Sequence, residues 1–192
     1  MSSPQRALVW KGLLEVIFIG FGVFLGMAAD QWRTDRQHRD QARDALQRFK
    51  VEIEHNKAAV EEVEDYHVRA REGIAAYLDP KTRAAANVNM PRGWQPARLE
   101  HTAWDLALAT QALADIEGAP AFELAQIYGL QQQYLDLTEG MTQAMYLRPP
   151  SENLTGFLHS VKVYYDDIVR IEPALLDSYG RILPLIDRAL KD

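Results

Sequence analysis

Residues 31–78 contain no proline and only one glycine, Gly73. Within this stretch, residues recur at alternating intervals of three and four positions and form a seam: Leu46, Phe49, Ile53, Asn56, Val60, Val63, His67, Ala70, Ile74 and Tyr77. All are apolar except Asn56 and His67, which we interpret as polar positions that set the register of packing. A seam of about four heptads predicts one long α-helix packed against a later helix of the same chain or against a second copy. Asp79 and Pro80 are expected to end it.

An apolar run precedes this helix. Residues 12–29 are apolar except for Glu15, and Trp10 and Trp32 flank the run. The two tryptophans are separated by about 33 Å of helix at ~1.5 Å per residue, close to the ~30 Å hydrocarbon core of a bilayer. Tryptophan favours the two membrane interfaces. We therefore expect an N-terminal flank at 1–11 and a transmembrane anchor at 12–31. A cleaved signal peptide is the alternative, with small residues before Ala29 as its cleavage site.

Small residues within the run favour close helix packing. Gly20, Gly22 and Gly26 lie in the predicted anchor, and Gly22 and Gly26 form a small-xxx-small pair. Such pairs let a second helix approach in lipid, although glycine is also simply common in membrane helices. Glu15 is expected to reach the interface, or alternatively to make a polar contact with a neighbouring membrane helix.

A basic stripe follows the run. Arg33, Arg36, Arg39 and Arg43 are spaced by three or four positions, which places them on one face of the helix. Near a bilayer each cation would contribute about 1 kcal/mol by binding anionic lipid headgroups. The alternative is that these arginines pair with acidic neighbours on the same helix, namely Asp35, Asp40 and Asp44.

The overall composition excludes several classes of protein. The 192 residues include 21 Lys and Arg against 27 Asp and Glu, a net charge of −6, so we expect no nucleic-acid partner. There is no cysteine, which excludes disulfide scaffolds, thiolate zinc sites and cysteine nucleophiles.

The remaining chain predicts a helical bundle. Prolines at 80, 91 and 96 indicate a loop over 80–98, and a bundle over 99–192 packs on the stalk helix at 32–79. Helices are expected at 98–116, from Pro120, from a cap at Ser151, and from Pro173, where a separate fifth helix would begin. No segment shows sustained strand alternation. The predicted fold is all-α: a transmembrane helix that continues into a long stalk helix, plus an antiparallel helical bundle.

The stretch LLEVIFIGFGVFLGMAADQWRTDRQHRDQARDALQRFKVEIEHN resembles a family of uncharacterised bacterial single-pass membrane proteins. In that family an apolar helix runs through a Trp into an Arg-rich helix. The stretches HTAWDLALATQALADI and FELAQIYGLQQQYLDL are similar to its Trp-bearing and Tyr-bearing helices. The resemblance implies an anchored helical domain in the bacterial inner (cytoplasmic) membrane, and it implies no activity.

Few residues suggest chemistry. Glu52 and Glu64 each precede a histidine by three positions, the spacing of carboxylate-bridged di-iron sites. The two pairs, Glu52–His55 and Glu64–His67, are about 18 Å apart along the helix, too far to share a metal. Glu52, Glu54, Glu61, Glu62 and Glu64 are instead interpreted as the solvated face. We expect no catalytic, cofactor-binding or metal site. Trp94, Trp104, Tyr128 and Tyr134 form either an aromatic pocket or, more simply, part of the core.

These observations predict a non-catalytic accessory or structural subunit of a membrane assembly, with lipid and a membrane protein or a second copy as partners. The alternative is a membrane-tethered sensor whose bundle binds a small ligand at the four aromatic residues. Arginines are more numerous after the apolar run than before it, which alone would keep the body in the cytoplasm. The resemblance implies the opposite orientation, because members of that family have more basic N-terminal flanks, and we favour a periplasmic body.

Overall fold

The computed structural model describes residues 3–88, 90–149 and 153–191, with side chains from Phe18 onward. In these residues the elements are α1 (Ser3–Leu78), the 3₁₀ turn η1 (Arg83–Ala85), α2 (Thr102–Ala109), the 3₁₀ turn η2 (Ala112–Asp115), α3 (Ala119–Tyr146) and α4 (Leu154–Ala189). No strand occurs in them, which confirms the all-α fold.

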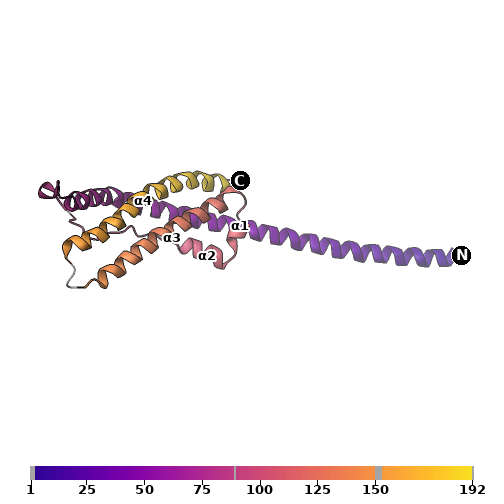
Figure 1. Ribbon diagram of the computed structural model, residues 1–192. Helices are drawn as coiled ribbons and strands as arrows, with labels where there is room; N and C mark the ends of the chain where they lie inside the picture. Colours follow the sequence, from indigo (N-terminus) through magenta and orange to yellow (C-terminus); the bar gives the residue numbers. More distant parts are fainter. Residues whose placement is uncertain (1–2, 89, 150–152, 192) are drawn as a thin grey trace.

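Helix α1 is a single rod. Its N-terminal part projects alone from one end of the molecule, and its C-terminal part runs through the bundle (Figure 1). The helix ends at Leu78, as Asp79 and Pro80 predicted. Among the side chains described from Phe18 onward, the first buried one along α1 is Ala42, so the body begins there.

The predicted seam of α1 is the buried face. Phe49, Ile53, Val60 and Ile74 are fully buried, and the polar positions Asn56 and His67 are buried as well. Of the ten seam residues, only Tyr77 near the helix end is partly exposed. The partner is in the same chain, because α1 packs mainly against α4, and α3 packs against α4 in turn. The helix α4 runs antiparallel to both α1 and α3 (Figure 1).

The expected fourth and fifth helices are one helix, so a break at Pro173 was the wrong prediction. Helix α4 continues through Pro173 and Pro184 to Ala189. Both prolines lie on its exposed side, where a carbonyl that loses its helical partner is close to water. The N-cap is Asn153, whose side chain accepts a hydrogen bond from the Gly156 amide at 2.7 Å. The cap proposed at Ser151 falls outside the described residues.

The segment 98–116, which was expected to be one helix, forms a short α-helix and a 3₁₀ turn instead. Helix α2 ends at Ala109, and η2 follows after Gln111, which has a left-handed φ of 59°. Helix α3 begins as predicted, with Pro120 in its first turn.

Among the residues with described side chains, no helix is apolar over a long enough stretch to cross a membrane. The apolar run 12–29 begins ahead of Phe18 and is therefore only partly contained in them. The spanning helix expected at 12–31 is unsupported by this part of the chain.

Candidate functional site

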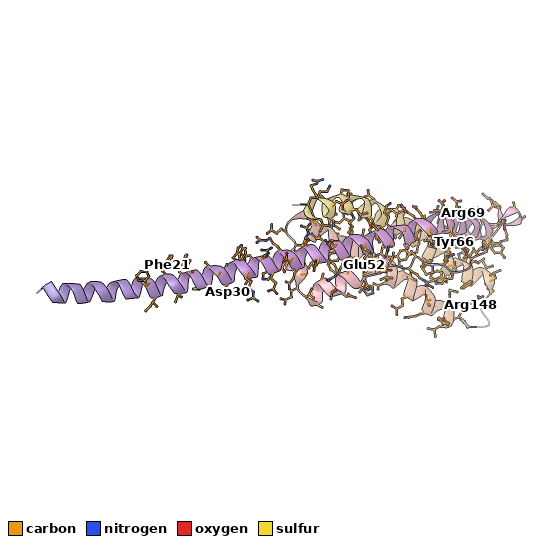
Figure 2. The ribbon with its side chains drawn as sticks, turned by 180° about the vertical axis from the view of Figure 1, so that it is seen from behind. Phe21, Asp30, Glu52, Tyr66, Arg69 and Arg148 are labelled. Carbon is orange, nitrogen blue, oxygen red and sulfur yellow. The ribbon has the colours of Figure 1, made fainter. Side chains whose placement is uncertain are left out.

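The free part of α1 presents apolar side chains to its surroundings. Phe18, Phe24, Met27 and Trp32 are 72, 65, 69 and 62% exposed. Figure 2 shows the labelled Phe21 and Asp30 on the bare rod, well apart from the body. From Phe18 to Arg39, every described side chain of α1 is exposed. Trp10 and Glu15, the other proposed interface and contact residues, lie outside the described side chains.

The three glycines of the predicted anchor face open space. A Cβ atom built at Gly20, Gly22 or Gly26 would meet no heavy atom within 4 Å. The protein's own fold therefore leaves these positions unoccupied, and their predicted contact with another helix stays a prediction.

The basic stripe is solvent-exposed at all four of its arginines, Arg33, Arg36, Arg39 and Arg43. The Arg36 guanidinium lies 5.7 Å from the centroid of the Trp32 ring. No ion pair joins the stripe to an acidic residue within the described part of the chain, and Asp35 accepts a hydrogen bond from Gln31 instead, at 2.8 Å. The alternative of pairing along the helix is therefore not what this structure shows.

A hollow of about 580 Å³ lies where the free part of α1 meets the body. Trp32, Arg36, Arg39 and Arg43 line it from α1, and Asp115 and Glu117 line it from η2 and the turn after it. Its apolar floor includes Ala42, Leu46 and Ile116, which are buried. Beside it, His38 Nδ1 lies 2.9 Å from Asp115 Oδ1 and ties α1 to η2.

A buried polar cluster connects α1 with α4. His67 and Glu172 are 1 and 0% exposed, and His67 Nδ1 lies 2.7 Å from Glu172 Oε1. The other ring nitrogen, Nε2, lies 2.8 Å from the carbonyl oxygen of Gln95 and must donate to it, because a carbonyl only accepts. Tyr134 donates to Glu172 Oε1 at 3.2 Å and accepts from the Ala97 amide at 2.8 Å.

A second buried cluster is centred on Glu52, which was wrongly assigned to the solvated face. Its carboxylate accepts from the Tyr128 hydroxyl at 2.6 Å and from the Ala103 amide at 2.8 Å. Burial and the bond to Glu52 raise the pKa of Tyr128. Of the other glutamates on that face, Glu54, Glu61 and Glu62 are exposed and Glu64 is half-buried. Burial raises the pKa of Glu64, and the nearby Glu172 raises it further.

The four aromatic residues divide between separate contacts. Trp104 stacks on Tyr128 with ring centroids 4.9 Å apart, whereas Trp94 packs on Tyr164 at 4.2 Å. Tyr134 belongs to the Glu172 cluster. Trp104 and Tyr128 line one surface hollow, of about 310 Å³.

The residues with metal-ligand spacing do not converge. His55 is exposed and lies 3.7 Å from Glu100, while His67 is buried against Glu172. No group of three or more potential ligands occurs in the described part of the chain.

Sequence reasoning missed Glu52 and Glu172 as buried anchors, although a signal was present for both. Glu52 follows Phe49 by three positions and precedes Asn56 by four, which continues the seam spacing. Glu172 follows Ile168 by four positions and precedes Leu175 by three, which is also seam spacing.

Comparison with known proteins gives no relative: no protein-family model, no curated protein and no solved structure matches this chain.

Proposed function

We propose that this chain is a non-catalytic, single-pass membrane protein whose helical body serves as an accessory or structural subunit of a membrane assembly. The observation that carries the proposal is the contrast between the two halves of α1. The half within the body buries its seam against α4, whereas the free half exposes large apolar side chains that no part of the chain covers. Lipid is the environment that such an apolar surface requires.

The order of residues along the rod supports a membrane anchor. The apolar run ends near Ala29, Trp32 follows it, and the exposed arginines come next. This is the order in which the hydrocarbon core, the interface and the lipid phosphates follow one another. The open faces of Gly22 and Gly26 support a role as a subunit, because a second membrane helix can approach closely there.

Native size in mild detergent tests this proposal. The full chain is extracted from membranes, and Gly22→Ile with Gly26→Ile is compared with Ala28→Ile, a control within the same apolar run. We expect the glycine substitutions to leave the chain's own packing unchanged, because a Cβ atom at either position meets no heavy atom within 4 Å beyond the helix's own backbone. We expect the unsubstituted chain and the control to form a larger particle than the glycine variant. A monomeric, partnerless particle for all three would contradict the proposal.

For the orientation we propose a periplasmic body. Protease added to intact spheroplasts would then digest the body, and cytoplasmic controls would survive. Survival of residues 33–192 until lysis would place the body in the cytoplasm instead.

A ligand-binding role is the second candidate, supported by the hollow beside Trp104 and Tyr128. Its volume of about 310 Å³ is at the lower end for small-molecule pockets. Because the two rings stack on each other, the ring faces that they share are not available to a ligand. A thermal-shift screen of the full chain tests this candidate, and the Trp104→Ala variant should lose any shift that is observed.

A further inference from the structure

The hollow at the foot of the body carries charges of both signs. Arg36, Arg39 and Arg43 contribute three cations, and Asp40, Asp115 and Glu117 contribute three carboxylates. Its formal charge is therefore zero. A site of this kind favours a ligand that itself carries both charges, because either sign alone would meet repulsion from half of the lining.

The height of these groups along α1 corresponds to the headgroup layer of a membrane that ends at Trp32. At ~1.5 Å per residue, Arg36 lies about 6 Å beyond Trp32, within the roughly 5–8 Å headgroup region of one leaflet. Arg39 lies about 10 Å beyond Trp32, just outside that region, and its long side chain can extend back into it. Asp115 lies at a similar height, because it contacts His38 on α1. Trp32 lines the hollow as well, so the hollow reaches the residue that borders the proposed membrane.

We propose that this hollow binds the headgroup of phosphatidylethanolamine. The phosphate lies against Arg36 and Arg39, and the primary ammonium lies against Asp115 and Glu117. This inference rests on the proposed membrane anchor, since it places the lipid in the leaflet that Trp32 borders.

The lining favours a primary ammonium over a quaternary one. A primary ammonium donates three hydrogen bonds, which carboxylates accept. A choline group makes none and is recognised by the faces of several aromatic rings. Here the only aromatic residue of the hollow is Trp32, and Arg36 already lies over its ring. An anionic glycerol headgroup offers the carboxylates only hydroxyl groups and no cation, so its own negative charge is left uncompensated by them.

Lipid retention by the full chain tests the inference. The chain is purified in mild detergent, supplied with equimolar phosphatidylethanolamine, phosphatidylcholine and phosphatidylglycerol, and examined by native mass spectrometry. Three variants are compared: Arg36→Gln with Arg39→Gln, Asp115→Asn with Glu117→Gln, and the control Arg33→Gln with Arg48→Gln. The control removes the same number of cations from α1 without touching the lining of the hollow.

We expect phosphatidylethanolamine to be retained about tenfold over both other lipids, a difference of ~1.4 kcal/mol. The control should match the unsubstituted chain, and Arg36→Gln with Arg39→Gln should abolish the preference. The carboxylate variant leaves a net positive hollow, so its preference should change to phosphatidylglycerol. Equal retention of the ethanolamine and choline lipids, or a carboxylate variant that keeps the original preference, would overturn the inference.

Flotation with neutral liposomes separates this inference from the proposed anchor. A chain that does not float refutes both. A chain that floats but shows no preference for the ethanolamine lipid refutes only the headgroup site.

Discussion

The buried pair of His67 and Glu172 should behave as one energetic unit. Because His67 Nε2 donates to the Gln95 carbonyl, one further proton lies between Nδ1 and Glu172 Oε1. Whichever atom holds that proton, the pair has no net charge. Glu172 Oε2 has no hydrogen-bond partner, so the carboxyl group depends on Oε1 alone for its stabilisation.

The contacts of His67 and Glu172 set how much unfolding free energy each substitution should remove. His67→Leu leaves Glu172 with only the Tyr134 hydroxyl as a donor and leaves the Gln95 carbonyl without a donor, which should cost ~3–5 kcal/mol of unfolding free energy. Glu172→Leu leaves Nδ1 unpaired and the Tyr134 hydroxyl without an acceptor, although that hydroxyl still accepts from the Ala97 amide, and it should cost ~1–3 kcal/mol. The double variant leaves only the Gln95 carbonyl without a donor and the Tyr134 hydroxyl without an acceptor, at ~1–3 kcal/mol. The two substitutions should therefore couple by at least ~1 kcal/mol.

Chemical denaturation of the full chain in mild detergent, followed by far-ultraviolet circular dichroism, measures this coupling. Glu62→Leu serves as the control, because Glu62 is exposed on the same helix as His67. Its unfolding free energy should change by less than ~0.5 kcal/mol. If the cost of the double variant equals the sum of the two single costs, the pair is not a unit and the reasoning fails.

Two further predictions concern the remaining buried polar groups. Asn56 binds the Glu100 backbone twice, donating to its carbonyl at 2.8 Å and accepting from its amide at 2.7 Å. Asn56→Ala should therefore lower the unfolding free energy by ~2–4 kcal/mol in the same denaturation assay. A cost below ~0.5 kcal/mol would contradict this prediction. Burial raises the pKa of Tyr128, Tyr134 and Tyr179. The stability that these neutral hydroxyl groups contribute is complete below the ordinary tyrosine pKa of ~10 and is lost as pH rises above it. The loss is at most ~1.4 kcal/mol per pH unit for each residue. Tyr179→Phe should remove one tyrosine's share from the slope of alkaline denaturation, and an unchanged slope would refute the assignment.

The long helix was predictable because its seam is uninterrupted. Three- and four-residue spacing identified the buried face of α1, and Asp79 with Pro80 identified its end. The same spacing runs through α4, along Tyr165, Ile168, Glu172, Leu175, Tyr179, Ile182 and Ile186, all of them buried. This seam crosses Pro173 without a change of phase. Proline at 173 predicted a break, whereas the seam predicts one continuous helix. The helix continues because a proline on its exposed face destabilises it less than loss of the packed seam would.

The buried glutamates were harder to recognise for a physical reason. Periodicity shows which face of a helix is buried, but it cannot show which polar residue on that face has a partner. The partner of Glu52 is the backbone of Ala103 together with Tyr128, at 51 and 76 residues' separation. Such contacts depend on how an irregular segment lies between helices, and no local sequence rule specifies that.

The buried polar residues have a common role in holding the connector between η1 and α2. His67 binds the Gln95 carbonyl, Tyr134 accepts from Ala97, and Asn56 binds Glu100. Glu52 accepts from the Ala103 amide in the first turn of α2, where the connector ends. This segment has no helical hydrogen bonds of its own, so its buried backbone groups need side-chain partners.

Glu52 and His67 were the residues with the spacing of metal ligands. Both have structural partners within the body instead. On the other half of α1, the described residues present an exposed apolar surface, open glycines and an exposed arginine stripe, one after another. A search for function is therefore best directed at the free end of the rod and at the hollow where it enters the body.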